Sequence, residues 1–362
     1  MNKTKQTEYK PDYVSAPGET LQETLHKLGI SQAELAERTG RPKKTINEII
    51  QGKAAITPET ALQLELVLRI PSRFWLAREA AYRAWLARQE ENLRISKDVS
   101  FLKNLPVKEM IANGWLEKAE DKCEQAKAAL SFFGVVSSDK IPLIEPVAFR
   151  QSQAFAVNQW ALAAWLRRGE LEAQRLPNTP YHREHFFKAL VEIQTITTEK
   201  PSVFVPQMQA LCLKSGVILI FVNELPKTSV SGATRWLGQT RPLIQLSLRY
   251  KTDDMFWFSF FHEAGHVYLE HAKREILLED KFKDTLDQRE LAANRFAMDL
   301  LIPADKFESY LAKNNFTHDS IKRFASSLGI APGIVVGRLQ YERKVDWKQF
   351  RDLKRSITWD DF

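Results

Sequence analysis

The sequence HEAGH at positions 262–266 constrains the fold of this chain more than any other feature. On an α-helix, residues four positions apart lie on the same face, so His262 and His266 can bind a single Zn²⁺ ion. Glu263 lies beside them and can take a proton from a water on that ion. The preceding run MFWFSFF is apolar, which predicts a buried helix whose surroundings exclude water from the site.

A site of this kind needs a third ligand, and two residues come into question. His271 lies nine residues after His262, which places it half a turn out of phase on a continuous helix. The longer metzincin pattern would require a glycine at Leu269 and a histidine at Ala272. We therefore set His271 aside as a ligand.

Glu290 is the better candidate for the third ligand. It lies 24 residues after His266, on a separate helix that is expected over residues 287–301. Asn294 follows one helical turn later, where its side chain can hydrogen-bond a ligand histidine. Two histidines and one glutamate leave a fourth position open, which is typical of a catalytic zinc site. Such a donor set also accepts Mn²⁺, Co²⁺ or Fe²⁺.

The H-E-x-x-H pattern also occurs by chance, but the residues around it resemble one family. The segments FWFSFFHEAGHVYLEH and ELAANRFAMDLLIP resemble the ImmA/IrrE family of zinc metallopeptidases, over about residues 202–345. The resemblance implies that His262, His266 and Glu290 are zinc ligands. It also implies that Glu263 is the general base.

A small sheet is expected upstream of the motif. Runs of β-branched and aromatic residues predict strands over residues 216–222, 231–236 and 243–248. By resemblance, residues 216–222 and 244–250 belong to the family's sheet, and a long helix is expected over residues 255–271. Family members commonly have threonine where this chain has Ser259, and we do not expect this change to abolish activity.

Near the N-terminus, Gln32, Ala36, Gly40 and Ile46 have the spacing of a helix-turn-helix. Such a motif needs a small residue where its helices cross, a glycine for the left-handed turn and an aliphatic anchor for the second helix. Ala36, Gly40 and Ile46 meet these requirements in turn. A plain helical hairpin with solvated lysines meets them too, so the spacing alone leaves both interpretations open.

The candidate DNA contacts are Gln32, Lys43, Lys44, Thr45 and Asn47. Lys43 and Lys44 can reach phosphates, whereas Thr45 and Asn47 have the chemistry to reach base edges. Residues 41–53 carry four basic residues and one acidic residue. This local excess of positive charge predicts an electrostatic footprint on DNA.

The stretch from Ala16 to Trp85 resembles the Xre-type DNA-binding domain of HigA antitoxins, including the segments ITPETAL and FWLAREAAY. The resemblance implies a five-helix domain that binds double-stranded operator DNA and forms a homodimer. It also implies that a toxin is often the protein partner.

A second stretch with helix-turn-helix spacing lies at Ile321, Ala325, Gly329 and Val335. The segment after its turn, APGIVVGRL, is too apolar to present base-reading side chains. We expect a packed helical pair there and not a second DNA reader.

We therefore expect a mainly α-helical protein with a small α+β zincin-like domain. The expected parts are a flexible tail (1–13), a five-helix helix-turn-helix domain (14–90), a helical connector region without a chemical motif (91–201) and a metallopeptidase domain with a small sheet (202–362).

Composition narrows the class of protein further. The 362 residues carry a net charge of +7, which favours polyanionic partners. Two cysteines, Cys123 and Cys212, are too few for a disulfide framework. The first 25 residues are polar, and no apolar run approaches the ~20 residues that a membrane helix needs. These features predict a cytoplasmic protein without a membrane segment.

Three functional hypotheses follow. The first is a DNA-binding transcriptional regulator whose zinc-dependent endopeptidase domain cleaves a partner repressor or antitoxin when a stress signal arrives. The second is a HigA-like antitoxin or repressor of a toxin–antitoxin module, whose zinc domain binds a partner or ligand and hydrolyses nothing. The third adds single-stranded DNA as an activator of the peptidase, on the basis of net charge and family resemblance.

Overall fold

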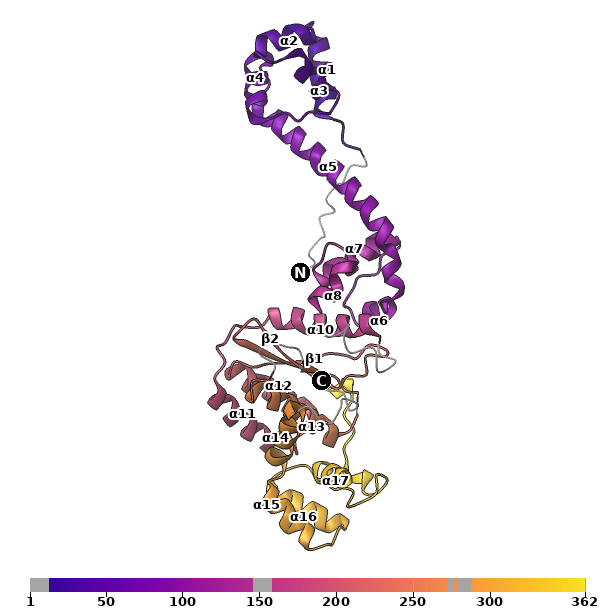
Figure 1. Ribbon diagram of the computed structural model, residues 1–362, viewed down its shortest axis with the longest axis vertical. Coiled ribbons are helices and arrows are strands. Elements are labelled where there is room, and N and C mark those ends of the chain that lie inside the picture. The colour runs from indigo at the N-terminus through magenta and orange to yellow at the C-terminus, as the bar shows by residue number, and fades with distance from the viewer. Residues whose placement is uncertain (1–12, 146–157, 250, 272–276, 279–287, 362) are drawn as a thin grey trace. The chain divides into compact units, whose positions relative to one another are not determined.

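The computed structural model describes residues 13–145, 158–249, 251–271, 277–278 and 288–361. The chain divides into two compact units, Met1–Val99 and Ser100–Phe362, which we describe separately as unit 1 and unit 2 (Figure 1). The expected mainly helical fold with a small sheet in its C-terminal part is confirmed. The finer division into a tail and three domains stays a prediction.

The helices of unit 1 follow one another with short connections. They are α1 (Pro17–Leu28), α2 (Gln32–Thr39), α3 (Lys43–Ile50), α4 (Pro58–Leu68) and α5 (Ser72–Asp98). Local signals set both ends of α2. Ser31 caps α2 by accepting a hydrogen bond of 3.1 Å from the Glu34 amide. Gly40 ends the same helix in the left-handed conformation, at φ 67°.

The core of unit 1 is apolar and encloses Trp75, which is fully buried. Ile46 and Ala36 lie in the same core, as the helix-turn-helix spacing requires. A Cβ atom on Gly18 would lie 2.2 Å from the Ile49 carbonyl oxygen. Glycine at this position therefore lets α1 lie against the end of α3.

Unit 2 begins with short helices and continues with three longer ones. They are η1 (Val99–Lys103), α6 (Val107–Ala112), α7 (Lys122–Phe133), η2 (Ser138–Lys140), α8 (Ile141–Ile144), α10 (Gln159–Gln174), α11 (Arg183–Thr195) and α12 (Pro201–Lys214).

The sheet of unit 2 has the strand order β1-β3-β2-β4. Its strands are β1 (Ile218–Phe221), β2 (Gly232–Leu237), β3 (Arg241–Leu246) and β4 (Leu277–Leu278). β1 is parallel to β3, while β2 is antiparallel to both β3 and β4. The three longer strands lie within two residues of their expected bounds at each end. The two-residue β4 was not expected.

The remaining helices follow the sheet in sequence. They are α13 (Asp253–Tyr268), α14 (Gln288–Leu301), α15 (Ala304–Ala312), α16 (His318–Leu328), α17 (Pro332–Tyr341), η4 (Arg351–Leu353) and η5 (Trp359–Asp361). The helix that carries the HEAGH motif ends at Tyr268, three residues before its expected end.

Helices cover both faces of the sheet, with α10 on one side and α11 to α14 on the other (Figure 1). Alternation along β2 explains how one strand serves both layers. Thr234 points toward α13 and bonds to Glu263, whereas its neighbour Arg235 donates to the carbonyl of Leu166 on α10 at 2.6 Å. The helix α10, which lies in the expected connector region 91–201, is thus an integral part of unit 2.

Side chains of the sheet hold α10 by its carbonyl groups. Gln245 donates to the Trp165 carbonyl at 2.7 Å, and Arg241 donates to the Ala173 carbonyl at 2.8 Å. A Cβ atom on Gly169 would lie 1.9 Å from Gln245 Oε1. Glycine at this position therefore allows α10 to approach β3 closely enough for these bonds.

Residues near the C-terminus hold the start of α13, and we call Lys354 and Arg355 the C-terminal clamp. The Arg355 guanidinium lies 3.0 Å from the Asp253 carboxylate, and the Lys354 ammonium lies 2.6 Å from the Asp254 carboxylate. Both carboxylates are buried in the first turn of α13. The amide of Asp253 also donates to the carbonyl of Arg355 at 2.9 Å.

The second stretch with helix-turn-helix spacing forms α16 and α17. Ile321, Ala325 and Val335 are fully buried and belong to the same core as α13. The pair therefore packs against the motif helix, as expected for a structural hairpin. Within the described ranges, every helix is too short or too polar to cross a bilayer.

Candidate metal centre and DNA-binding face

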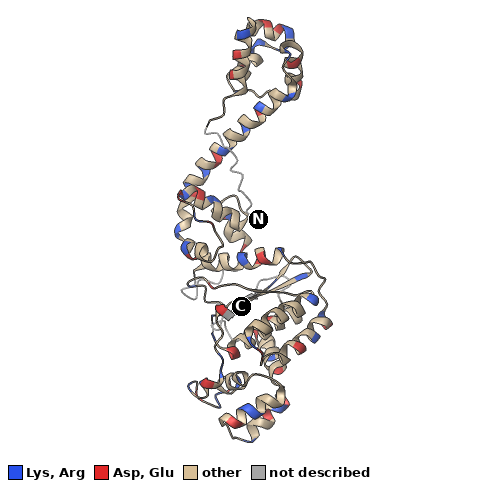
Figure 2. Cartoon of the chain, turned by 180° about the vertical axis from the view of Figure 1, so that it is seen from behind, with Lys and Arg blue, Asp and Glu red and all other residues tan. Residues whose placement is uncertain are grey.

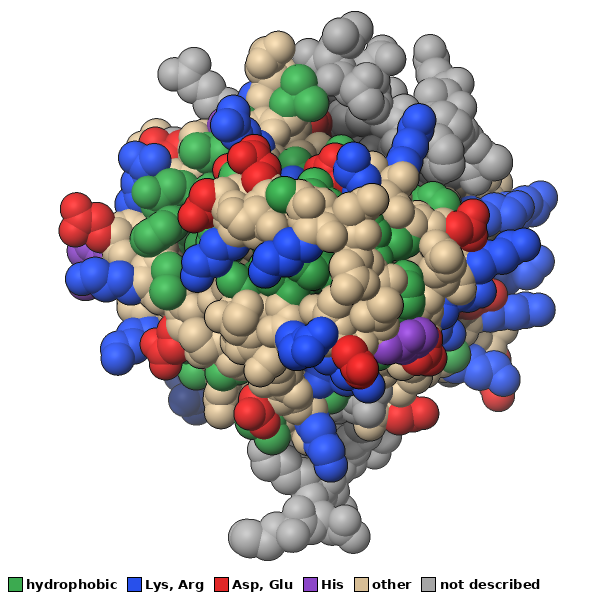
Figure 3. Space-filling view, turned by 90° about the horizontal axis from the view of Figure 1, so that it is seen from below, with side chains coloured by type: hydrophobic (Ala, Val, Ile, Leu, Met, Phe, Trp, Pro, Cys, Tyr) green, Lys and Arg blue, Asp and Glu red, His purple; other side chains and the backbone are tan. Residues whose placement is uncertain are grey.

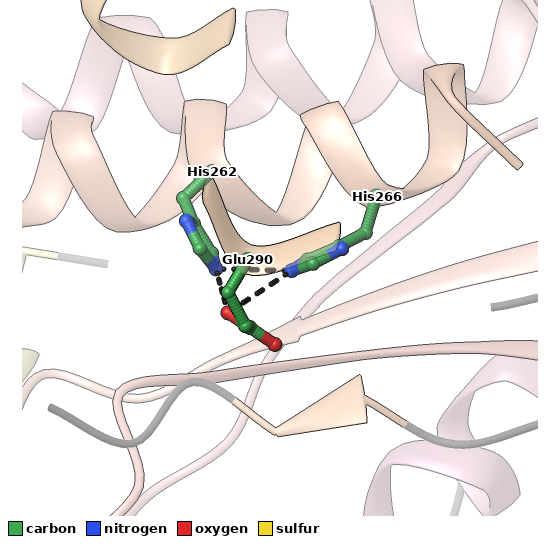
Figure 4. A group of neighbouring side chains, drawn as sticks. All are labelled: His262, His266 and Glu290. Atoms are coloured by element: carbon green, nitrogen blue, oxygen red, sulfur yellow. Dashed lines mark hydrogen bonds and ion pairs between the residues drawn. The ribbon is translucent and has the colours of Figure 1, made fainter. Parts of the chain in front are cut away.

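The helix α13 brings His262 and His266 onto one face. Their Nε2 atoms lie 3.0 Å apart, and both side chains are almost fully buried. Figure 4 shows the two imidazoles extending from this helix toward the carboxylate of Glu290. The two histidine side chains therefore meet on one face of the helix, as a spacing of four residues requires.

Glu290 comes from the first turn of α14, the helix that lies alongside α13. Its Oε2 atom lies 3.3 Å from His262 Nε2 and 3.6 Å from His266 Nε2. One ligand atom from each of the three residues lies within 4.8 Å of the others. Gly265 lets the helices approach, since its Cβ would already lie 3.3 Å from the Ala293 backbone.

The protonation states of the cluster favour metal binding. Burial, assisted by the neighbouring His262, lowers the pKa of His266 to about 4, so this imidazole is neutral at pH 7. Burial opposes ionisation of Glu290, but hydrogen bonds from His262 and His266 outweigh it and lower the pKa of the carboxyl. Neutral imidazoles and a carboxylate are the forms that bind a metal ion.

Each histidine has a hydrogen-bond partner on its other ring nitrogen. His262 Nδ1 lies 2.9 Å from Asn294 Oδ1, and His266 Nδ1 lies 3.2 Å from His271 Nδ1. His271 therefore lies behind His266 and outside the three-residue cluster. No sequence pattern indicates this contact, because it depends on how the chain turns after α13.

Glu263 is fully buried and lies against β2. The Thr234 hydroxyl is 2.5 Å from Glu263 Oε2 and 3.1 Å from the Glu263 carbonyl oxygen. A Cβ atom on Gly232 would lie 2.7 Å from Glu263 Cγ, so a larger residue would displace this side chain. Neither Thr234 nor Gly232 was among the expected site residues, since strand periodicity does not identify partners across elements.

The candidate DNA contacts lie on α2 and α3 of unit 1. Lys43, Lys44 and Asn47 are exposed, whereas Thr45 and Gln32 are half-buried. Basic and acidic residues are interspersed along the helices of this unit (Figure 2). The predicted positive charge is thus local to residues around α3 and not a property of the whole unit.

The fold and the His–Glu cluster define a helix-turn-helix protein with a peptidase-like domain that carries a candidate metal-binding cluster. The chain belongs to the helix-turn-helix family of DNA-binding regulators, whose model matches residues 21–75. Residues 217–340 match the IrrE N-terminal-like domain of the peptidase family M78. Both family resemblances inferred from the sequence are confirmed.

Two relatives of known sequence each match about a quarter of the chain. An uncharacterized HTH-type transcriptional regulator, YddM of Escherichia coli K12, is 33% identical over 81 residues, or 22% of this chain and 84% of the relative. Virulence-associated protein A of Dichelobacter nodosus is 32% identical over 88 residues, or 24% of this chain and 82% of the relative.

A solved structure is also similar to part of the chain. It is an addiction module antidote protein of a HigA family from Coxiella burnetii, with 31% identity and a TM-score of 0.22. The similarity covers 24% of this chain and 94% of that one.

Proposed function

We propose that this protein is a DNA-binding transcriptional regulator with a zinc-dependent endopeptidase domain. In the proposal, a stress signal leads the domain to cleave a partner protein, either a repressor or an antitoxin. The observation that carries the proposal is the convergence of His262, His266 and Glu290, with Glu263 buried beside them.

The donor set fits zinc. Two neutral imidazoles and one carboxylate are the ligands of a catalytic zinc site, which keeps a fourth position open. A bound zinc ion would supply Lewis-acid activation of water and of the scissile carbonyl. His262, His266 and Glu290 would hold the ion, while Asn294 would orient the ring of His262.

The remaining steps fall to residues of this chain. Glu263 accepts a proton from the attacking water and returns it to the leaving amine. The hydrogen bond from Thr234 restricts the rotation of the Glu263 carboxylate. The ring of Phe258 lies 6.0 Å from the ring of His262, so an apolar side chain borders the site of this proton transfer.

New protein N-termini test the peptidase function. Native-host cells would express wild type, Glu263→Gln or Glu308→Gln, with and without DNA damage. Glu308 lies on the exposed face of α15, so its variant is a matched control for the same substitution outside the site. We expect a new N-terminus with wild type and Glu308→Gln, and its absence with Glu263→Gln.

Identical sets of N-termini in all three strains would contradict the proposal. The alternative would then be preferred, in which the chain is an antitoxin or repressor of a toxin–antitoxin module and its zinc domain binds a partner or ligand. A small toxin encoded beside the gene would support the alternative, whereas a small separate repressor would support cleavage.

We also propose that unit 1 binds double-stranded operator DNA as a homodimer, in the cytoplasm. Leu62 and Leu66 lie one turn apart on α4, and Leu66 is 83% exposed, which supports an apolar contact with a second copy. Sedimentation of Leu66→Glu should give a lighter species than wild type at equal concentration.

Single-stranded DNA as an activator stays a prediction. Figure 3 views unit 2 from the end where α15 and α16 lie and shows Lys and Arg side chains projecting together at one edge. An increase in the rate of substrate cleavage on adding an oligonucleotide would support this activator, and an unchanged rate would contradict it.

A further inference from the structure

The end of α13 is followed by a turn that brings the chain back to the metal-binding helix. Glu270 has the left-handed φ of 59°, a conformation that residues with a Cβ atom disfavour. The turn is closed by two backbone hydrogen bonds, from Glu270 to the Val267 carbonyl at 3.1 Å and from His271 to the His266 carbonyl at 3.0 Å. As a result, the His271 ring lies beside the ring of His266.

The geometry of this pair fixes the direction of its hydrogen bond once His266 acts as a ligand. His266 Nε2 faces His262 and Glu290, so its Nδ1 atom must carry the ring hydrogen. His271 Nδ1, 3.2 Å away, must then accept that hydrogen bond. The arrangement therefore needs an acceptor at position 271.

The other histidine of the cluster has an equivalent partner. Asn294 Oδ1 lies 2.9 Å from His262 Nδ1, so it accepts the ring hydrogen when His262 Nε2 is the ligand atom. Asn294 comes from α14, whereas His271 comes from the turn after α13 itself. Each imidazole thus has one acceptor, and the two acceptors come from different elements.

We propose that His271 is a positioning residue for the metal site, which fixes the tautomer and ring orientation of His266. The left-handed turn at Glu270 places the His271 side chain beside His266. The proposal rests on the proposed metal centre and adds a role for a residue outside the ligand set. Partners of this kind typically change metal affinity by about 10–100-fold when they are removed.

Metal affinity of the full-length protein tests the proposal without any need for a substrate. Zn²⁺ is titrated against a chromophoric chelator, and the visible spectrum of the Co²⁺ form reports the ligand geometry. Asn at position 271 places an amide oxygen where His271 Nδ1 lies, so His271→Asn keeps an acceptor. His271→Leu removes it, and Asn294→Leu serves as the benchmark for the other imidazole.

We expect His271→Asn to bind Zn²⁺ within about 3-fold of wild type, and His271→Leu to bind about 10–100-fold more weakly with an altered Co²⁺ spectrum. A second pair of variants tests the backbone conformation of the turn and keeps His271 in the sequence. Glu270→Gly suits the left-handed φ and should bind like wild type, whereas the β-branched Glu270→Val should weaken binding. Helical circular dichroism of each metal-free variant reports folding.

The outcomes separate this inference from the function it rests on. If wild type binds metal and His271→Leu binds equally tightly, His271 has no positioning role, while the proposed metal centre stands. Equal losses in His271→Asn and His271→Leu would also overturn the inference, because the acceptor would then not be the cause. If wild type binds neither ion, the metal centre and the role of His271 are both wrong.

Discussion

The Thr234 hydroxyl donates a hydrogen bond of 2.5 Å to the carboxylate of Glu263. This bond joins the middle of β2 to the motif helix at the residue that we propose as general base. Both side chains are fully buried, so no bulk water competes for the bond. Thr234 therefore restricts Glu263, just as Asn294 restricts His262.

Replacing Thr234 tests whether this bond contributes to turnover. Thr234→Val keeps the shape of the side chain and removes the donor, and we expect turnover of the substrate to fall about 10–100-fold. Zinc affinity should not change, because the Thr234 hydroxyl bonds to Glu263, which is not among the proposed ligands. Thr234→Ser keeps the hydroxyl and is the control. Cleavage by Thr234→Val at the wild-type rate would show that Glu263 needs no such restraint.

Substitutions in α3 should separate phosphate contacts from base contacts. Lys44→Ala should weaken binding to all DNA sequences and reduce the slope of affinity against salt by about 1. Asn47→Ala should cost about 1–3 kcal/mol on the operator and relax the preference at one base pair. Lys306→Ala, on the exposed face of α15, is the control. Titrations over a salt series measure both effects, and equal salt slopes for wild type and Lys44→Ala would refute the phosphate contact.

Tyr181 should make the free energy of unfolding depend on pH above about 10. Its hydroxyl has no hydrogen-bond partner among the described residues, and burial raises its pKa from 10.0 to about 12. Between these values the unfolded chain loses the phenol proton while the folded chain keeps it. Stability should therefore fall as pH rises from about 10 to about 12. Urea unfolding across this range measures the slope.

Tyr181→Phe is the matched control for this pH dependence. Phenylalanine cannot ionise, so the variant should lack the part of the slope that Tyr181 contributes and should be at least as stable above pH 10. Parallel pH profiles for wild type and Tyr181→Phe would exclude a contribution from this residue.

The C-terminal clamp should matter for stability because its partners are buried. Lys354 Nζ lies 2.6 Å from Asp254 Oδ2 and 2.7 Å from Gln340 Oε1. Lys354→Met leaves the Asp254 charge buried without its cation, which should lower the free energy of unfolding by about 3–5 kcal/mol. Adding Asp254→Asn removes that charge and should restore part of the loss. Denaturant unfolding of wild type, the single variant and the double variant measures the coupling, and equal stabilities would contradict it.

The residues that the sequence brought together correctly are those related by a local period. His262 and His266 share a helix face because the spacing of four matches the helical turn. Glu290 and Asn294 are likewise one turn apart on α14, and the family resemblance placed Glu290 in the cluster. The structure brings all four side chains to one place.

The contacts that the sequence could not indicate depend on pairings between distant segments. Thr234 reaches Glu263 from a strand 29 residues upstream, and no pattern in either segment identifies the other. His271 reaches His266 only because a glutamate adopts a conformation that glycine usually supplies. No sequence motif indicates the hydrogen bonds from β3 to α10 either, because their acceptors are backbone carbonyl groups, which every residue has.

The C-terminal clamp also orders events during protein synthesis. Arg355 bonds to Asp253, 102 positions earlier, so a ribosome adding about 5–20 residues per second supplies this partner roughly 5–20 s after the start of α13. All five helices of the DNA-binding unit have left the ribosome long before then. A nascent chain can thus expose its folded helix-turn-helix unit first, while Asp253 and Asp254 at the start of α13 still lack Arg355 and Lys354. The order of synthesis therefore lets the DNA-binding unit fold before the domain that matches the peptidase family is complete.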